Sequence, residues 1–217
     1  PLLKSNSDLK SFRTACAIAG QVCDELLATY VAPGQTTMDV EREANRLLAL
    51  KRSSAPFKTV DGFGHAVCIS INDEVVNGPP SRLRTFQEGD LVSIAIGAEH
   101  RGLYGKAART RYIGDDCPDN IQNLITGSRA VFDRVLDAFS SPQPPQTLQQ
   151  LLRLVPETAN RYGLTIIKGT GGCAIGKQLH MEPATYNHPP EKAHDDANHE
   201  HMHEHPEDVL LPGFAFT

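Results

Sequence analysis

The sequence contains no tryptophan, and aromatic residues make up only 6% of it. Proteins that bind single-stranded nucleic acids stack bases on aromatic side chains, so a stacking platform is not expected. Basic residues are also outnumbered, because 21 Lys and Arg stand against 26 Asp and Glu, which gives a formal net charge of −5. Phosphate recognition normally needs a basic face. These two shortages argue against a nucleic-acid partner.

Long hydrophobic runs are missing as well. No apolar stretch approaches the length of a membrane span, and the N-terminal residues lack the apolar segment of a signal peptide. We therefore expect no membrane partner and a cytoplasmic location.

The sequence contains few cysteines, and their spacing does not suggest disulfide pairs. The chain has five cysteines, an odd number without a CxxC pair: Cys16, Cys23, Cys68, Cys117 and Cys173. A disulfide framework normally shows an even number at regular spacings, so this pattern predicts reduced thiols.

With 217 residues and 40% hydrophobic content, the chain is long enough to bury one sizeable core. Two helices are predicted first. Ser7 and Asp8 are expected to cap the first, which the Pro33–Gly34 pair should stop, and Thr36 or Thr37 should cap the second. Their apolar stripes repeat at helical spacing through Phe12, Ala15, Ala19, Val22, Leu26 and Leu27, and then through Val40, Ala44, Leu47 and Leu48.

Three strands should follow, at residues 66–71, 91–96 and 109–113, because apolar and β-branched residues alternate there between turn signals. The order then recurs. Two further helices lie on either side of a Pro-rich break at 141–145, and strand-like segments follow at 164–167 and near Leu179 and His180. The whole is α+β. It predicts a single domain, 1–217, with pseudo-halves 1–114 and 115–217 whose strands form one curved antiparallel sheet, with helices outside and a cleft at the pseudo-twofold.

Five segments then carry a resemblance to type I methionine aminopeptidases, members of the M24 peptidases with the pita-bread fold. VCISINDEVVNGPP (67–80) resembles the family's strand and loop ending in HGIP, and GDLVSIAI (89–96) resembles its G-D-x-V-x-I-D strand. GLYGKAARTRYIG (102–114) is similar to its G-x-x-G-D-x-x-R-T-F stretch. GGCAIGKQLHMEP (171–183) resembles its GHGIGxxxHEEP run, and LLPGFAFT (210–217) matches the approach to its next acidic ligand. The resemblance spans nearly the whole chain and implies the pita-bread fold.

The same resemblance implies that the family's metal ligands are replaced. The two aspartate positions hold Ala95 and Lys106, and the ligand histidine position holds Cys173. The substrate-contacting histidine of the HGIP-type loop is Asn77, whereas His180, which the family places beside the scissile bond, is kept. A dinuclear site needs bridging carboxylates and an imidazole to hold two cations. We expect no metal at these positions.

Lys106 admits two interpretations. In one it is structural, and its ammonium takes the place of the lost cations and neutralises acidic groups. In the other its pKa is depressed by burial, and Lys106 serves as a base or Schiff-base nucleophile. Cys173 is either a space-filling thiol or a nucleophile with His180 as its base. Arg109 matches the family's structural arginine and is expected in strand pairing or a salt bridge.

A histidine-rich loop, predicted at 191–208, stands apart from the ancestral site. Imidazoles that alternate among acidic residues can converge on Zn²⁺ or Ni²⁺. The alternatives are a polar insertion that takes up metal adventitiously and a pH-responsive surface. The histidines are His194, His199, His201, His203 and His205.

The sequence ends at Thr217, before the family's last two acidic ligands. If the protein ends there, the closing strands of the sheet are absent, and the open edge is expected to pair with a second chain or a second copy. If it continues, further residues could restore acidic groups to the cleft.

Together these patterns predict a methionine aminopeptidase-like pseudoenzyme without resident cofactor, whose cleft binds a peptide, a chain terminus or a partner protein. Inactive relatives of this fold bind proteins, which is an argument by analogy. One alternative is a metal-independent enzyme that uses Lys106, Cys173 and His180 on a small amide or amino-acid-like substrate. The other is a metal-handling protein that acts through the histidine-rich loop.

Overall fold

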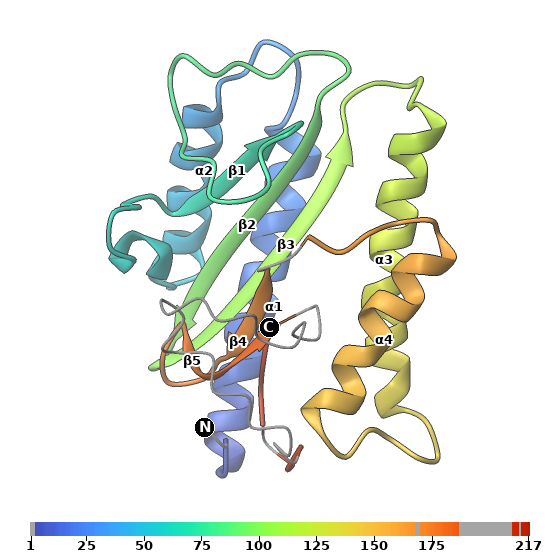
Figure 1. Ribbon diagram of the computed structural model, residues 1–217. Helices are drawn as coiled ribbons and strands as arrows, with labels where there is room; N and C mark the ends of the chain where they lie inside the picture. Colours follow the sequence, from blue (N-terminus) through green and yellow to red (C-terminus); the bar gives the residue numbers. More distant parts are fainter. Residues whose placement is uncertain (1–2, 168–169, 187–209, 213) are drawn as a thin grey trace, which may run out of the picture.

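The computed structural model describes residues 3–167, 170–186, 210–212 and 214–217 (Figure 1). In the described part, pairs of helices precede groups of strands, and this order occurs twice. The elements are α1 (Asn6–Thr29), α2 (Thr37–Leu50), η1 (Pro56–Thr59), β1 (Val67–Ile71), β2 (Leu91–His100), β3 (Leu103–Tyr112), α3 (Asp119–Phe139), α4 (Leu148–Arg161), β4 (Gly171–Ala174) and β5 (Met181–Tyr186).

Helix α1 begins earlier than predicted. Its N-cap is Ser5, whose Oγ accepts a hydrogen bond from the backbone N–H of Asp8 at 2.9 Å. Ser7 and Asp8 therefore lie inside the first turn, and the prediction that they cap the helix is wrong. Asp8 still stabilises this end, because a carboxylate in the first turn interacts favourably with the helix dipole.

Helices α2 and α4 begin with the same device, a threonine capping box. The Thr36 hydroxyl accepts from the Asp39 N–H at 3.2 Å, and the Asp39 carboxylate accepts from the Thr36 N–H at 2.8 Å. Thr147 and Gln150 repeat this exchange at 3.2 and 3.3 Å. Each box satisfies backbone donors that a helix start leaves without partners. The predicted threonine start of α2 is confirmed, and Thr36 is the residue that caps it.

Strands β1, β2 and β3 form an antiparallel sheet in that order. A two-residue turn at Arg101 and Gly102, both with positive φ, joins β2 to β3. Both strands are longer than predicted, and the added parts contain Gly97 and Gly105. A Cβ at Gly105 would lie 2.5 Å from the backbone nitrogen of Cys16 in α1. Glycine thus allows helix and strand to approach closely here, although it usually weakens a strand.

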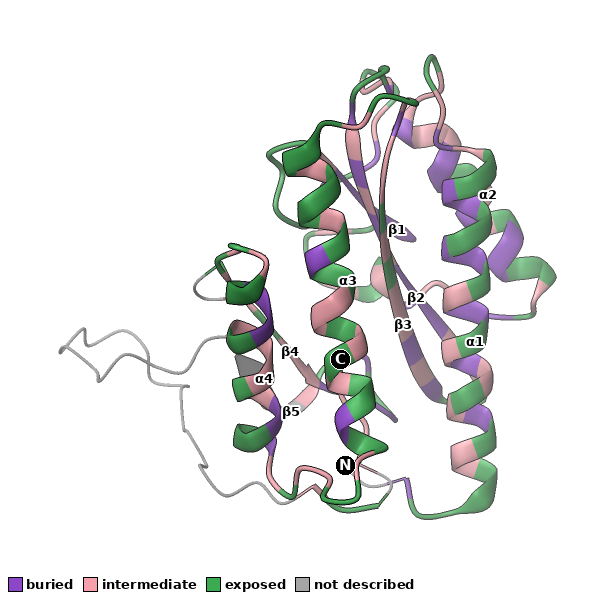
Figure 2. Cartoon of the chain, turned by 90° about the vertical axis from the view of Figure 1, so that its right-hand side faces the viewer, coloured by how far each residue is buried: buried purple, intermediate pink, exposed green. Residues whose placement is uncertain are grey.

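The main core lies between this sheet and the helices α1 and α2, which cover one of its faces (Figure 2). One face of α1 packs against β2 and β3, and its fully buried residues include Ala15, Val22 and Leu26. Phe86, in the connection before β2, is also fully buried there. The sheet residues of this core alternate along the strands as Val67, Ile69, Val92, Ile94, Ile96 and Ala98.

The second group of strands differs from the prediction. Residues 164–167 are not a strand, because Leu164 closes the end of α4: its N–H donates to the Ala159 carbonyl at 3.0 Å. The strands are β4 and β5, which pair as an antiparallel ladder, and the predicted segment near Leu179 and His180 is the bend that leads into β5. This ladder contacts the first sheet through the Tyr104 N–H, which donates to the Gly176 carbonyl at 2.8 Å. In the described residues the two sets of strands therefore meet at few points, without a continuous ladder.

Helix α3 carries several large apolar side chains that are exposed. Its buried residues are only Gly127 and Ala138, whereas Phe132 is 55% exposed and Leu136 is 51% exposed. No helix in the described part of the chain combines the length and apolar character that a membrane crossing requires. The apolar stripe of α3 meets α4 on one side, and Figure 1 shows this helix pair beside the sheet.

Candidate functional site

Strand alternation places Lys106 on the face of the sheet opposite α1. Gly105 faces α1, so its neighbour Lys106 must point the other way. In the register of β2 and β3, Gly97 pairs with Lys106 and Ala95 pairs with Ala108. Ala95 and Lys106 are therefore diagonal neighbours on one face, as the resemblance implies for two ligand positions.

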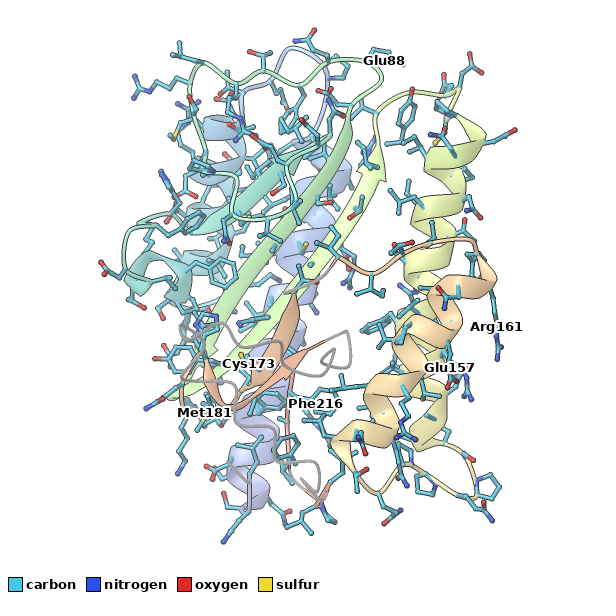
Figure 3. The ribbon with its side chains drawn as sticks, in the orientation of Figure 1. Glu88, Glu157, Arg161, Cys173, Met181 and Phe216 are labelled. Carbon is cyan, nitrogen blue, oxygen red and sulfur yellow. The ribbon has the colours of Figure 1, made fainter. Side chains whose placement is uncertain are left out.

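Strand β4 brings Cys173 to the same face. The hydrogen bond from Tyr104 to Gly176 fixes the end of β4 against the start of β3. Lys106 Nζ then donates a hydrogen bond to Cys173 Sγ at 3.8 Å, across 67 positions of sequence. Figure 3 shows Cys173 on the short ribbon in front of the long strands. We call Lys106, Cys173 and His180, together with Ala95, the Lys106 site.

The thiol of Cys173 has three polar neighbours. Besides Lys106, its sulfur lies 3.9 Å from the Thr217 hydroxyl and donates to the Leu179 carbonyl at 4.0 Å. Thr217 also binds the backbone of Cys173, because its N–H donates to the Cys173 carbonyl at 2.9 Å. The sulfur is thus held between β3, the loop after β4 and the last described segment.

The electrostatics of the site are dominated by one cation. Burial lowers the pKa of Lys106, and attraction to Cys173 together with their hydrogen bond partly offsets that shift. Burial also lowers the pKa of His180, and the positive charge of Lys106 lowers it further. Both shifts disfavour the positively charged forms of the two side chains.

The residues present do not fit a pair of divalent metal ions. Within the described ranges, no three His, Cys, Asp or Glu side chains come together closely enough to hold a metal ion. Ala95 has no atom that can bind a metal ion. The Lys106 side chain acts as a hydrogen-bond donor to Cys173 and not as a metal ligand. Cys173 is a soft ligand without companions. Among the residues that the structure describes, the donor set therefore lacks the bridging carboxylates that two catalytic ions require.

Asn77 lies apart from this group. It is an exposed loop residue with a φ of 61°, and in the described residues it makes no hydrogen bond to Lys106, Cys173 or His180. Its neighbour Gly78 fixes the loop, because the Ile69 N–H donates to the Gly78 carbonyl at 2.8 Å. The prediction that Asn77 contacts a ligand remains a prediction.

A row of hydroxyl groups that was not predicted from the sequence lies on the same face. Ser70, Ser93 and Thr110 occupy adjacent positions on β1, β2 and β3, and Ser93 Oγ lies 2.7 Å from Thr110 Oγ1. Cys68 lies one step along β1 on this face, with Sγ 3.8 Å from Ser70 Oγ. Alternation within the predicted strands carried this signal, since Ser93 and Ala95 share a side of β2.

Arg109 is confirmed as a salt-bridge residue. Its Nε donates to the Asp24 carboxylate of α1 at 2.9 Å, and its terminal nitrogen donates to the Ala108 carbonyl at 2.9 Å. Arg109 points toward the helix layer, on the other face from Lys106. It ties β3 to α1.

Two surface hollows of the described residues lie elsewhere. One, of about 730 Å³, lies along the outer face of α1 near Lys10 and Arg13. Another, of about 400 Å³, lies beside the connection from α3 to α4 near Pro144. Neither is lined by Lys106, Cys173 or His180.

The histidine-rich segment predicted at 191–208 lies outside the described residues. The binding of Zn²⁺ or Ni²⁺ by this segment stays a prediction. Its five histidines are His194, His199, His201, His203 and His205.

Comparisons with known proteins agree with the fold. The family model for metallopeptidase family M24 matches residues 10–217. A methionine aminopeptidase from Aquifex aeolicus is 31% identical over 192 residues, which cover 85% of this chain and 72% of that protein. One from Clostridium acetobutylicum is 29% identical over 187 residues, covering 86% and 73%. The crystal structure of a methionine aminopeptidase from Thermotoga maritima superposes with a TM-score of 0.81 at 27% identity, covering 98% of this chain and 78% of that one.

Proposed function

The chain belongs to metallopeptidase family M24 and has its α+β pita-bread fold, and we propose that it is an aminopeptidase-like protein that binds peptides without metal-dependent hydrolysis. The observation that carries this proposal is the hydrogen bond from Lys106 Nζ to Cys173 Sγ at 3.8 Å. A cation and a thiol interact directly at two positions where the family resemblance implies metal ligands. The ligand we propose is an extended peptide or chain terminus, supplied as such or as part of a partner protein.

Lys106 disfavours metal at this site for an electrostatic reason. Two divalent ions would place four positive charges beside an ammonium group, and at about 4 Å each unit of like charge costs several kcal/mol at the effective dielectric of a protein site. Deprotonation of Lys106 would remove that repulsion but would supply only a neutral amine. No bridging carboxylate then holds the ions. The described residues of this site therefore favour peptide binding over metal-assisted hydrolysis.

The sign of the charge also favours one end of a peptide. Lys106 forms no ion pair with an Asp or Glu side chain in the described residues. A half-buried ammonium whose described partner is a cysteine sulfur and not a carboxylate attracts carboxylates and repels an N-terminal ammonium. We propose that the site prefers the carboxylate end or an acidic side chain of its ligand, the opposite of an enzyme that acts on the amino end.

The free edge of β3 supports binding of an extended segment. The peptide group of Tyr104 points away from β2, because its N–H bonds to Gly176. Alternation along an antiparallel strand points the peptide groups of Lys106, Ala108 and Thr110 the same way. Arg109 covers the Ala108 carbonyl, and the remaining groups have no hydrogen-bond partner in the described part of the chain. A partner peptide that pairs with this edge passes directly by Lys106.

The first test asks whether the protein hydrolyses an aminopeptidase substrate. The peptide Met-Ala-Ser is incubated with the protein and with Co²⁺ or Mn²⁺, and free methionine is measured by chromatography. An active methionine aminopeptidase under the same conditions is the positive control. We expect no methionine above the protein-free blank. Release that rises with protein concentration and stops with a chelator would refute the proposal.

The second test asks what binds. A pool of randomised pentapeptides with free C-termini is passed over immobilised protein, in parallel with the same pool amidated, and retained peptides are measured by mass spectrometry. We expect retention of the free-acid pool to exceed that of the amidated pool. The variant Lys106→Gln should lose most of this difference, whereas Lys10→Gln, on the outer face of α1, should keep it. Equal retention of both pools would contradict the assigned charge preference.

One alternative function has an observation in its favour. Lys106 and Cys173 touch, and their neighbour His180 has a lowered pKa because of burial and the Lys106 charge. A neutral imidazole is a competent base, so the three residues are candidates for metal-independent catalysis on a small amide. Borohydride trapping with carbonyl compounds and timed alkylation test this. If Lys106 and Cys173 react no faster than other lysines and cysteines, the enzyme hypothesis fails.

A further inference from the structure

The contact between Lys106 and Cys173 joins two parts of the fold that otherwise meet at few points. Lys106 lies on β3 of the first sheet and Cys173 lies on β4 of the second ladder. The same ladder is joined to β3 by the backbone bond from Tyr104 to Gly176. A covalent bond between the two side chains would therefore lock the ladder to the sheet.

We propose that Lys106 and Cys173 are a modification site, at which a peroxide joins the lysine nitrogen directly to the cysteine sulfur. The two atoms already lie 3.8 Å apart, with the amine as hydrogen-bond donor to the sulfur. The lysine side chain has four rotatable bonds, so a shift of about 2 Å in its end needs no backbone movement.

The chemistry balances in two steps. The Cys173 thiol attacks hydrogen peroxide, the O–O bond breaks, and the products are a sulfenic acid and one water. The lone pair of the neutral Lys106 amine then attacks that sulfur, the S–O bond breaks, and a second water leaves with a proton from the nitrogen. The sum is one amine, one thiol and one peroxide giving one N–S bond and two waters. Sulfur is oxidised by two electrons, and the peroxide is reduced by two.

Three features of the site favour the second step. Burial lowers the pKa of Lys106, which raises the share of its neutral amine. Burial and the Lys106 charge lower the pKa of His180, which favours the neutral imidazole as an acceptor for the released proton. The remaining neighbours of the sulfur are the Thr217 hydroxyl and the Leu179 carbonyl, which do not compete as nucleophiles at sulfur.

The other cysteines lack this arrangement. Cys23 is buried, with a pKa raised by burial to about 12, and burial also raises the pKa of Cys16. Cys68 contacts Ser70, and Cys117 contacts the Pro118 carbonyl. Among the described residues, only Cys173 has a lysine nitrogen within hydrogen-bonding distance. Cys117 is the matched control, because it is also half-exposed and a free thiol.

One consequence rests on the proposed function. Once bonded to sulfur, the Lys106 nitrogen is no longer an ammonium, so the carboxylate preference of the site should disappear. The N–S bond is also cleaved by thiols, which attack the sulfur and release the amine. Oxidation would then switch the carboxylate preference off, and a thiol reductant would restore it.

The test treats the full chain with hydrogen peroxide, removes the excess, and digests it without reductant for mass spectrometry. We expect the peptides that contain Lys106 and Cys173 to appear linked, about 2 Da lighter than their sum, and to separate with dithiothreitol. Lys106→Arg should abolish the link and leave Cys173 as a sulfenic acid that dimedone labels. Cys117→Ser should leave the yield unchanged.

Several results would overturn the modification site. They are a disulfide between Cys173 and Cys68, a product about 14 Da heavier that keeps one oxygen, and Cys173 oxidised beyond sulfenic acid while Lys106 stays free. Peptide retention separates the two proposals. A link that forms without changing retention of the free-acid pool refutes the switch, whereas an untreated protein that retains no peptide refutes the proposed function and leaves the link standing.

Discussion

The first half of the chain and the second are built from the same local signals but are packed very differently. Helices α2 and α4 both start at a threonine capping box. Yet α1 buries eight of its side chains against the sheet, whereas α3, of similar length, buries only Gly127 and Ala138. The main core belongs to the first half, and the second has a small cluster around Ala138, Leu148 and Leu151. The capping residues determine where a helix begins. The number of side chains that the helix buries determines how much it contributes to the stability of the fold.

This difference bears on the Lys106 site, which lies where the halves meet. Lys106 is carried by a strand anchored to α1 through Gly105 and Arg109. Cys173 is carried by a short strand whose described contacts to that sheet are few. The site therefore combines a fixed cation with a thiol on the less buried part of the fold. Variants that alter one half and leave the other unchanged test this account.

The largest effect is expected from truncating the main core. Phe86 is fully buried, so Phe86→Ala should lower the free energy of unfolding by about 3–5 kcal/mol. Phe132 in α3 is 55% exposed, and Phe132→Ala should cost no more than about 1 kcal/mol. Urea denaturation followed by circular dichroism measures both. Similar losses for the two variants would remove the contrast between the halves.

A smaller loss should follow from closing the gap between α1 and β3. A Cβ at position 105 would lie 2.5 Å from Cys16 N and 2.6 Å from Ala15 C, so Gly105→Ala should destabilise by about 2–3 kcal/mol. The matched control is Gly20→Ala in α1, where the nearest atom is 3.9 Å away. That change should stabilise the helix by about 0.5–1 kcal/mol. Thermal unfolding of both variants gives the signs, and equal signs would contradict the close approach.

Glu41 offers a polar test of the same half. Its buried carboxylate accepts hydrogen bonds from the N–H groups of Ala66 and Val67 at 3.0–3.2 Å. Glu41→Gln replaces one acceptor oxygen by a donor, and the loss should be about 1–3 kcal/mol. Glu43→Gln, which removes only an exposed pair with Arg46, should cost about 0–1 kcal/mol. If the two variants unfold at the same urea concentration, Glu41 does not anchor β1.

The smallest expected effect is the pH dependence of stability that His180 contributes at the Lys106 site, where the two halves meet. Burial and the Lys106 charge lower the pKa of His180 below its usual 6.5. Between the folded pKa and 6.5 the unfolded chain binds more protons, so stability should rise with pH across that window and level off above it. His180→Gln should abolish this contribution, and Lys106→Gln should make the rise shallower. Denaturation midpoints measured at stepwise pH check it, and a profile that His180→Gln leaves unchanged would refute the shift.

Much of the first half was predictable from local patterns, while the second half was not. The threonine starts and the alternation in 91–96 are local signals, and they gave α2 and β2 correctly. The added lengths of β2 and β3 were not predicted because they contain glycines, whose strand propensity is weak. In the fold, close packing outweighs that weak propensity. Residues 164–167 have the alternation of a strand, but Leu164 caps α4 instead. The Lys106 to Cys173 contact spans 67 positions, which no local pattern reveals. Only the family resemblance placed those residues together.

The central claim is that a cation and a thiol hold the place of two metal ions. The most direct test titrates Mn²⁺, Co²⁺ and Zn²⁺ into a variant whose five histidines at 194, 199, 201, 203 and 205 are serine, so that the histidine-rich segment does not contribute. Bound metal is measured by mass spectrometry of the elements after gel filtration. We predict no stoichiometric metal in this variant. Two ions per chain that survive gel filtration and are lost in Cys173→Ser would contradict the account.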